Sequence, residues 1–208
     1  MVCISKLSDE LAHRSMQEAS DREFIKAYID TCLPYLPANP EILEFDGGIT
    51  YADAIIEKKG GKVFFATKRG REDRYNKISY ELDLEIEELP DSFDVIIATQ
   101  VLGSFVDPCM VVKRFERMLK HKGCLILTVS GPSYPCIRGL ISFFSKEGLT
   151  RVGQSVFGVK NVKNIRAFGD IYSAICMMNY VNNSLYKDLK CFDKYKHEVI
   201  NGILCVKE

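Results

Sequence analysis

The stretch that decides the fold runs from residue 83 to residue 129 and reads D-L-E-I-E-E-L-P-D-S-F-D-V-I-I-A-T-Q-V-L-G-S-F-V-D-P-C-M-V-V-K-R-F-E-R-M-L-K-H-K-G-C-L-I-L-T-V. Two apolar runs in it, residues 93–98 and 124–129, are typical of strands that are buried on both faces. Residues 108–119 between them have helical periodicity, and the turn at residues 121–123 leads into the second strand. A strand, a helix and a strand in this order predict a parallel βαβ unit covered by helices.

Outward from this stretch, strands and helices continue to alternate. The first forty residues are expected to be largely helical, with one start at residues 8–10 and a second apolar-periodic run from Asp21 to Leu33, and the prolines at 34, 37 and 40 stop helix formation. Further helices are expected at residues 51–59, 143–157 and 170–181. Together with the two central strands, further strands are expected at residues 42–45, 62–66, 77–82, 162–168 and 199–206. The sequence therefore predicts an α/β fold with a doubly wound, mostly parallel, seven-stranded sheet and helices on both faces.

Length and composition indicate one globular domain. The chain has 208 residues, of which 47% are hydrophobic and 27% charged. We expect a single domain over residues 1–208, with an N-terminal helical cap at 1–40 and an α/β core at 41–208. Lys and Arg number 28, as do Asp and Glu, so the net charge is zero and no strong field favours nucleic acid or an anionic membrane. Because no signal peptide or long apolar span is recognised, we expect a cytoplasmic protein.

The eight cysteines are scattered and form no C-x-x-C pair. Cys124 and Cys205 lie in apolar runs and Cys176 in an apolar helix, where a free thiol behaves as a small hydrophobic group. The three histidines are far apart in sequence. We therefore expect buried thiols and no metal site.

The first predicted strand ends in the turn E-F-D-G-G-I-T, residues 44–50. In an open parallel sheet, ligands bind at the carboxyl ends of the strands, where the strand order reverses. Gly47 and Gly48 allow the backbone to approach a ligand closely, and the next helix is expected to offer free amides to an anionic group. A two-glycine turn is equally typical of a plain connection between a strand and a helix.

The stretch from 83 to 129 resembles the middle of the class I S-adenosylmethionine-dependent methyltransferases. The likeness is to the small enzymes of the family that act on small molecules and sugars. It rests on an acidic residue, a leucine-proline, S-F-D entering a strand, V-L, D-P, and R-x-L-K-x-G-G before the next strand, here R-M-L-K-H-K-G. Weaker similarity continues at residues 144–149 and 167–170, and the resemblance covers residues 40–207.

The resemblance implies S-adenosylmethionine as cofactor and assigns residues to its site. Glu44 would orient the glycine loop, Asp83 would accept from the adenine amino group and Leu84 would pack on the ring, although Asp83 is also suited to capping a turn. Thr99 and Gln100 would lie beneath the sulfonium and face the substrate. The full cofactor set is Glu44, Asp46, Gly47, Gly48, Ile49, Thr50, Thr67, Asp83, Leu84, Thr99 and Gln100.

Three departures from the family pattern bear on activity. Asp46 and Thr50 stand at the first and third glycine positions of the loop E-x-G-x-G-x-G. Thr67 or Lys68 stands where the family has an acidic residue for both ribose hydroxyls, and neither accepts two hydroxyl protons as a carboxylate does. The family's L-E-H reads L-G-S at residues 102–104, so the sequence identifies no catalytic base.

Two functions follow from the resemblance. The first is an S-adenosylmethionine-dependent methyltransferase acting on a small-molecule acceptor, such as a sugar or another hydroxylated metabolite. The alternative is a non-catalytic protein of the same fold that serves as a binding or partner subunit, and either a homodimer or a heteromeric complex is compatible with it. A dinucleotide-binding protein is disfavoured because G-x-G-x-x-G is absent.

Overall fold

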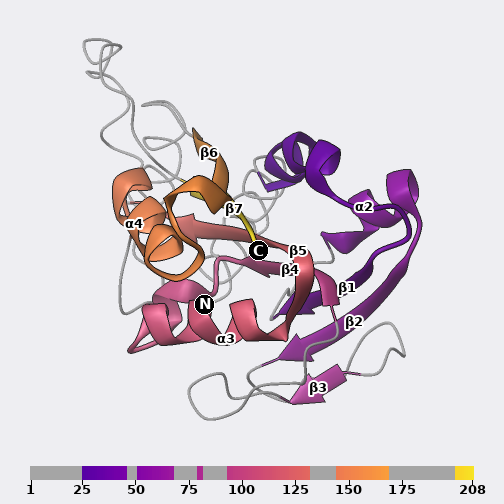
Figure 1. The fold of residues 1–208 in the computed structure, drawn as a ribbon, viewed down its shortest axis with the longest axis horizontal. Helices are drawn as coiled ribbons and strands as arrows, with labels where there is room; N and C mark the ends of the chain where they lie inside the picture. Colours follow the sequence, from indigo (N-terminus) through magenta and orange to yellow (C-terminus); the bar gives the residue numbers. More distant parts are fainter. Residues whose placement is uncertain (1–24, 46–50, 68–78, 82–92, 132–143, 169–199) are drawn as a thin grey trace, which may run out of the picture.

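The computed structural model describes residues 25–45, 51–67, 79–81, 93–131, 144–168 and 200–208 (Figure 1). Seven strands form one sheet: β1 (Glu41–Phe45), β2 (Lys62–Thr67), β3 (Ser79–Glu81), β4 (Phe93–Thr99), β5 (Leu119–Ser130), β6 (Val162–Phe168) and β7 (Ile200–Val206). The described helices are residues 25–32, α2 (Ala52–Lys59), α3 (Pro108–Met118) and α4 (Lys146–Phe157), with 3₁₀ turns η1 (Leu33–Tyr35), η2 (Leu102–Ser104) and η3 (Val159–Asn161).

The strand order is β3-β2-β1-β4-β5-β7-β6. All neighbouring pairs from β3 to β5 are parallel, whereas β7 is antiparallel to both β5 and β6. β1 pairs with β2 on one side and with β4 on the other, so the strand order reverses beside β1. The predicted doubly wound, mostly parallel, seven-stranded sheet is confirmed, and its switch point lies between β1 and β4.

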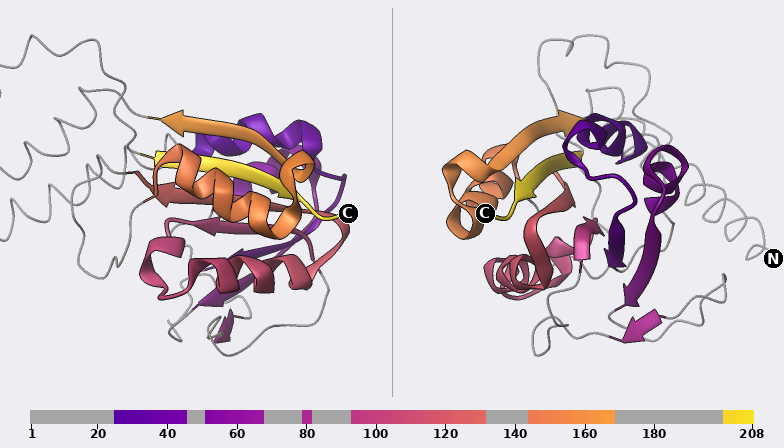
Figure 2. Two further views of the ribbon diagram at one scale, coloured as in Figure 1. Left: turned by 60° about the vertical axis from the view of Figure 1, so that its left-hand side comes forward. Right: turned by 45° about the vertical axis from the view of Figure 1, so that its right-hand side comes forward.

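Helices cover both faces of the sheet (Figure 2). α3 and α4 lie on one face, where Phe45 of β1 packs edge-on against Phe115 of α3 with ring centroids 5.6 Å apart. The helix over residues 25–32 lies with α2 on the opposite face, against Ile97 of β4 and Ile126 of β5. Because side chains alternate along a strand, each central strand contributes to both cores, and this is why β4 and β5 are nearly continuous apolar runs.

The helix over residues 25–32 is held to β6 and β7 by specific contacts. The hydroxyl of Tyr28, which is fully buried, donates a hydrogen bond to the carbonyl of Asn164 at 3.1 Å. Asn164 has a φ of 48° at an irregularity of β6, and its Nδ2 donates to Thr31 Oγ1 at 2.8 Å and to Cys32 Sγ at 3.2 Å. Asparagine tolerates this left-handed backbone better than most residues, so one residue of β6 anchors the end of the helix.

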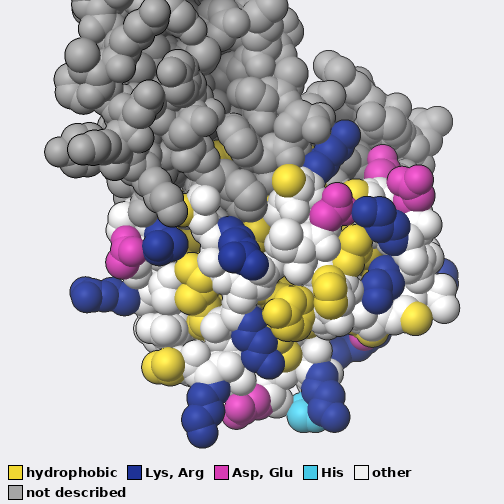
Figure 3. All heavy atoms as spheres, turned by 90° about the horizontal axis from the view of Figure 1, so that it is seen from above, with side chains coloured by type: hydrophobic (Ala, Val, Ile, Leu, Met, Phe, Trp, Pro, Cys, Tyr) yellow, Lys and Arg dark blue, Asp and Glu magenta, His cyan; other side chains and the backbone are white. Residues whose placement is uncertain are grey.

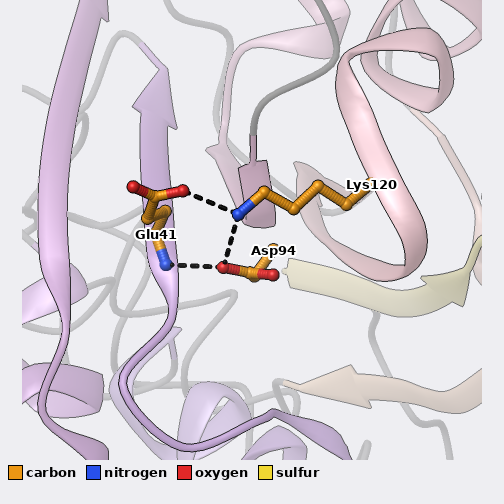
Figure 4. Close-up of polar contacts among 3 residues, drawn as sticks. All are labelled: Glu41, Asp94 and Lys120. Carbon is orange, nitrogen blue, oxygen red and sulfur yellow. Dashed lines mark hydrogen bonds and ion pairs between the residues drawn. The ribbon is translucent and has the colours of Figure 1, made fainter.

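A group of three charged residues joins the amino ends of β1, β4 and β5 (Figure 4). Lys120 Nζ lies 2.6 Å from Glu41 Oε2 and 3.1 Å from Asp94 Oδ2, which also accepts from the backbone amide of Glu41 at 2.9 Å. Hydrogen bonding to Glu41 and then to Asp94 raises the pKa of the Lys120 ammonium. The group is partly exposed, so its contribution to stability is modest, about 1 kcal/mol or less.

Several predicted elements are longer or shorter than expected. β5 starts at Leu119 and not at residue 124, because Leu119 already pairs with Phe93 of β4. The register then shifts over residues 120–123, where Lys122 has a φ of 63°. α4 begins at Lys146, three residues later than predicted, where Ser145 Oγ caps it by accepting from Gly148 N at 3.1 Å. The helix predicted at residues 170–181 lies outside the described residues.

The surface and the thiols agree with the composition. Seen from above, Lys and Arg side chains are dispersed among hydrophobic and acidic ones (Figure 3). Cys124 and Cys205 are buried and unpaired, as predicted, whereas Cys176 lies outside the described part of the chain. No helix among the described residues has the length and apolar character needed to cross a membrane.

Candidate functional site

The buried polar side chains of the described chain gather at one edge of the sheet. They are Glu44, Thr99, Thr128, Ser130 and Asn201. The first four lie at or near the carboxyl ends of the parallel strands β1, β4 and β5, and Asn201 lies at the start of β7, which runs the opposite way. Buried polar groups are costly unless they are paired. Their concentration at the edge where doubly wound sheets bind ligands identifies this edge as the candidate site.

Glu44 fixes the start of α2. Its side chain is fully buried, with Oε1 accepting from the amide of Tyr51 at 2.7 Å and Oε2 accepting from that of Ala52 at 3.2 Å. A carboxylate at a helix N-terminus is stabilised by the helix dipole as well as by these bonds. The expectation that these amides are free for an anionic ligand is therefore wrong in part, because a side chain of the protein occupies two of them.

Gln100 follows the last residue of β4 in a left-handed conformation, with a φ of 59°. Its backbone amide donates to the carbonyl of Thr128 at 2.9 Å, which extends the pairing with β5 by one bond. Its side-chain Oε1 accepts from the hydroxyl of Ser130 at 2.5 Å. The other end of this carboxamide, Nε2, is buried and has no hydrogen-bond partner among the described residues. A buried unpaired donor costs about 1–3 kcal/mol, so it needs an explanation.

The chain returns to the same edge at Phe144. The Phe144 amide donates to the carbonyl of Ser130 at 3.2 Å, and the Phe144 carbonyl accepts from Asn201 Nδ2 at 2.9 Å. These bonds join Phe144, two residues before α4, to the end of β5 and to the start of β7. Thr128 pairs with the last residue of β4 on one side and with a residue near the start of β7 on the other. Its hydroxyl is fully buried and likewise has no partner within the described residues.

The structure brings some of the predicted site residues together. Glu44, Thr99 and Gln100 lie at this edge on the neighbouring strands β1 and β4, and Thr67 ends β2 at the same edge. The other predicted residues lie outside the described part of the chain: Asp46, Gly47, Gly48, Ile49, Thr50, Asp83 and Leu84.

Sequence reasoning missed three polar residues of this edge, Thr128, Ser130 and Asn201. The signal that identified Thr99 and Gln100, a polar residue directly after an apolar run, also applies to Ser130. Asn201 precedes the apolar part of its strand, and only the antiparallel direction of β7 brings it to this edge.

The chemistry available at the described edge is hydrogen bonding and positioning. It offers hydroxyls and a carboxamide, while its buried carboxylate, Glu44, is engaged with backbone amides. His121 is the histidine within the described ranges, and it is exposed in the irregular segment of β5 near the amino ends of the strands, away from this edge. The described residues therefore suit the binding and orientation of a polar ligand.

A doubly wound α/β sheet with buried polar groups at its carboxyl edge defines a ligand-binding class of protein. Residues 16–163 match the family model described as a methyltransferase domain. The chain belongs to this methyltransferase-domain family. A sequence comparison with curated proteins gives no match.

Solved structures share the fold at low sequence identity. An S-adenosylmethionine-dependent methyltransferase from Archaeoglobus fulgidus is 13% identical with a TM-score of 0.61, over 89% of this chain and 94% of that chain. A protein in complex with the Haloferax volcanii Trm112 methyltransferase activator is 14% identical with a TM-score of 0.61, over 95% and 96%. Burkholderia thailandensis 1,6-didemethyltoxoflavin-N1-methyltransferase, with 1,6-didemethyltoxoflavin and S-adenosylhomocysteine bound, is 10% identical with a TM-score of 0.60, over 90% of this chain and 78% of that chain.

S-adenosylmethionine is the cofactor of this family, and the described residues fit it. They place an unpaired buried donor, Gln100 Nε2, and the hydroxyl of Thr99 directly beside the switch point. The cofactor carries acceptors for such donors: the oxygen atoms of its carboxylate and its ribose, and the ring nitrogen atoms of its adenine. The chemistry of the edge is thus compatible with a polar ligand of this kind.

Proposed function

We propose that this protein is an S-adenosylmethionine-dependent methyltransferase that acts on a small-molecule acceptor, such as a sugar or another hydroxylated metabolite. The observation that carries the proposal is the gathering of the buried polar side chains at the carboxyl edge, with Gln100 Nε2 unpaired among the described residues. Such an arrangement is expected where a polar ligand completes the hydrogen bonding. The nature of the acceptor rests on the resemblance of residues 83–129 to small-molecule methyltransferases.

In this proposal the cofactor set is the one expected from the sequence. Glu44 holds the start of α2 through the amides of Tyr51 and Ala52. Asp46, Gly47, Gly48, Ile49 and Thr50 form that turn, Thr67 faces the ribose, Asp83 and Leu84 bind the adenine, and Thr99 and Gln100 orient the reacting end. Residues 1–40 act as a cap on the core, and the protein works in the cytoplasm.

The work required of the protein is mainly alignment. When bound, the cofactor supplies a methyl group that is already electrophilic. The chain contributes by orienting the acceptor and by keeping water away, and correct orientation alone accounts for a large part of a rate enhancement. In this proposal Thr99, which is buried at the end of β4, and Gln100 next to it take this role.

Calorimetric titration with S-adenosylmethionine and S-adenosylhomocysteine tests the proposal. We expect micromolar binding that is lost in Asp83→Ala and Gly48→Val variants, since one removes the adenine contact and the other fills the turn. Release of S-adenosylhomocysteine in the presence of a panel of hydroxylated acceptors then identifies the substrate class. The absence of both binding heat and thermal stabilisation at millimolar ligand would refute the enzyme.

The alternative, a non-catalytic partner subunit, is favoured by a specific feature of the sequence. Asp46 and Thr50 replace loop glycines, and Thr67 replaces the ribose carboxylate. The alternative predicts no cofactor binding together with a stable complex. Light scattering coupled to gel filtration distinguishes a monomer, a homodimer and a heteromeric complex, and a monomer that binds the cofactor contradicts the alternative.

A further inference from the structure

The zero net charge of the chain hides a separation of charge along the sequence. Lys and Arg number 28, as do Asp and Glu, but residues 108–169 hold 11 of the basic residues and only two of the acidic ones, Glu116 and Glu147. The rest of the chain carries the compensating acidic excess. Such asymmetry between parts of a chain indicates an anionic partner, and the net charge of the whole chain gives no sign of it.

The structure places the basic part of the chain on one layer of the fold. Its described residues form α3, β5, α4, η3 and β6, and α3 and α4 lie side by side over one face of the sheet (Figure 2). Each helix buries one side against the sheet, with Val111 and Phe115 in α3 and with Leu149 and Gly153 in α4. The other sides of the two helices are therefore left at the surface next to each other.

Basic side chains predominate on this outer side. Lys113 and Arg117 in α3, Arg151 in α4 and Lys160 in η3 are exposed, and we call these four residues the basic surface. Lys113 and Arg117 are four residues apart, so they lie on the same side of their helix. Lys113, Arg151 and Lys160 form no ion pair with any described residue.

The two acidic residues of this layer do not neutralise the basic surface. Glu147 lies 3.6 Å from the ammonium of Lys146, and Glu116 lies 3.8 Å from that of Lys207, which follows β7. Each acid thus has a lysine partner that does not belong to the basic surface. Positive charges gathered on one surface without internal compensation attract an anionic partner.

The character of the surface favours the phosphate backbone of RNA over a protein. Protein interfaces have an apolar, often aromatic centre, whereas among the described residues of α3, α4 and η3 only Val159 is a large exposed apolar side chain. Phosphate contacts require only basic and polar groups. Because α3 and α4 lie flat beside each other, neither protrudes like a helix that enters the major groove of DNA, and double-helical RNA is recognised without such insertion.

We propose that the basic surface binds the phosphate backbone of double-helical RNA. This activity goes beyond methyl transfer and does not depend on it. The surface also extends away from the carboxyl edge of the sheet. Arg117 is near the end of α3, which leads into the start of β5, and Lys160 directly precedes β6, whose first residue lies level with the first half of β5.

Binding to a fluorescently labelled RNA duplex tests the proposal in the full chain. A duplex of about 16 base pairs is long enough for a protein domain to contact two successive grooves. Anisotropy is measured as the salt concentration is raised. We expect the affinity to fall by about 40- to 150-fold between about 50 and 200 mM salt, as for three or four phosphate contacts. A DNA duplex of the same length should bind more weakly.

Two double variants with the same net charge locate the binding surface. Lys113→Gln/Arg151→Gln removes two contacts and should weaken RNA binding by about 30- to 100-fold at about 100 mM salt, with a salt slope lower by about 2. Lys26→Gln/Lys62→Gln is the matched control, since Lys26 lies on the helix of the opposite face and Lys62 starts β2, both exposed. Its affinity should stay within about twofold, because distant charges are screened.

Lys160→Gln, added to the first double variant, should weaken RNA binding further, by about five- to tenfold. Circular dichroism verifies that each variant is folded. Calorimetry with S-adenosylhomocysteine should give the same result for the native protein and for Lys113→Gln/Arg151→Gln, because the basic surface takes no part in cofactor binding.

The outcomes are distinct. Equal losses in the two double variants would show that RNA responds only to net charge and would overturn the proposal. Equal binding of the DNA duplex, or binding of vesicles of phosphatidylcholine and phosphatidylserine in place of RNA, would overturn the assignment to RNA. A native protein that binds S-adenosylhomocysteine but no RNA at about 50 mM salt overturns this inference and leaves the methyltransferase standing. One that binds RNA but no S-adenosylhomocysteine does the reverse.

Discussion

The ring of Tyr28 lies against the backbone of Gly202, so closely that a Cβ atom at position 202 would be 2.7 Å from the ring. Gly202 pairs with Thr128 of β5 on one side and with Arg166 of β6 on the other. The absence of a side chain at one position of β7 therefore makes room for the N-terminal helix to lie directly on the sheet.

Gly202→Ala should destabilise the protein by about 1–3 kcal/mol, because three ring atoms lie within 2.9 Å of the new methyl group and an aromatic ring cannot bend away. Denaturant unfolding followed by circular dichroism measures the change. Gly148→Ala is the matched control, since its Cβ would meet only Ser145 Oγ at 3.4 Å within α4. That variant should be neutral or more stable by about 0.5–1 kcal/mol. Equal losses in both variants would contradict the steric explanation.

Glu44→Gln should cost about 1–3 kcal/mol. Both carboxylate oxygens accept from backbone amides, and the amide nitrogen of glutamine would face one of these donors and leave it unpaired in the core. Glu41→Gln on the same strand is the control, because Glu41 is 41% exposed and its ion pair with Lys120 is worth about 1 kcal/mol or less. Urea unfolding measures the free energy of unfolding of both variants and so compares the loss at the two ends of β1. A larger loss in Glu41→Gln would show that the Glu44 bonds are weaker than their geometry indicates.

Asn164→Ala should destabilise by about 1–3 kcal/mol, since it removes the hydrogen bonds to Thr31 and Cys32 and puts alanine, which tolerates a left-handed backbone less well than asparagine, at a φ of 48°. Asn164→Gly loses the same bonds and tolerates the backbone, so it should be less destabilised than the alanine variant by about 1 kcal/mol. The melting temperatures of the two variants give the comparison. If the glycine variant melts no higher than the alanine variant, backbone strain at this position does not contribute to the loss of stability.

Stability should fall as the pH rises above 9. Burial raises the pKa of the Cys124 thiol from an ordinary 9.0 to about 11 and that of Cys205 to about 12. Between these values the unfolded chain releases protons that the folded chain keeps, so unfolding is favoured by up to about 1.4 kcal/mol per pH unit for each thiol. Unfolding free energies under reducing conditions at pH 7.5, 9 and 10.5 measure this loss.

Cys124→Ala isolates one of these thiols. The variant should be less stable at neutral pH because of lost packing, but its stability should decline less steeply above pH 9 than that of the native protein. Parallel declines in the two proteins would show that Cys124 does not contribute to the alkaline sensitivity.

The sequence predicted the sheet well because β4 and β5 are apolar on both faces, a pattern that few other elements share. It did not predict the irregular register at residues 120–123, which arises where Lys122 and Gly123 bond with Lys207 near the end of the chain. Such a contact between residues far apart in sequence leaves no local signal.

The part of the candidate site that lies at the end of a single strand could be predicted from the sequence. Thr99 and Gln100 follow an apolar run, and their place at the sheet edge is a direct consequence. The pairing of Ser130 with Gln100 was not predictable, because it depends on the left-handed turn after β4 and on its distance from β5. The use of the α2 amides by Glu44 was likewise hidden, since it depends on a side-chain direction and not on residue type.

The place of β7 has a consequence for biosynthesis. Residues 200–206 are the last of the seven strands to be translated, yet they lie between β5 and β6 and give each its partner on that side. Until they leave the ribosome, β5 has an open edge and β6 has no neighbour in the sheet. A nascent chain with such edges is prone to aggregation and suited to capture by chaperones. The strands from β3 to β5 have all their mutual partners by residue 130, whereas β6 can join the sheet only once residue 206 has emerged.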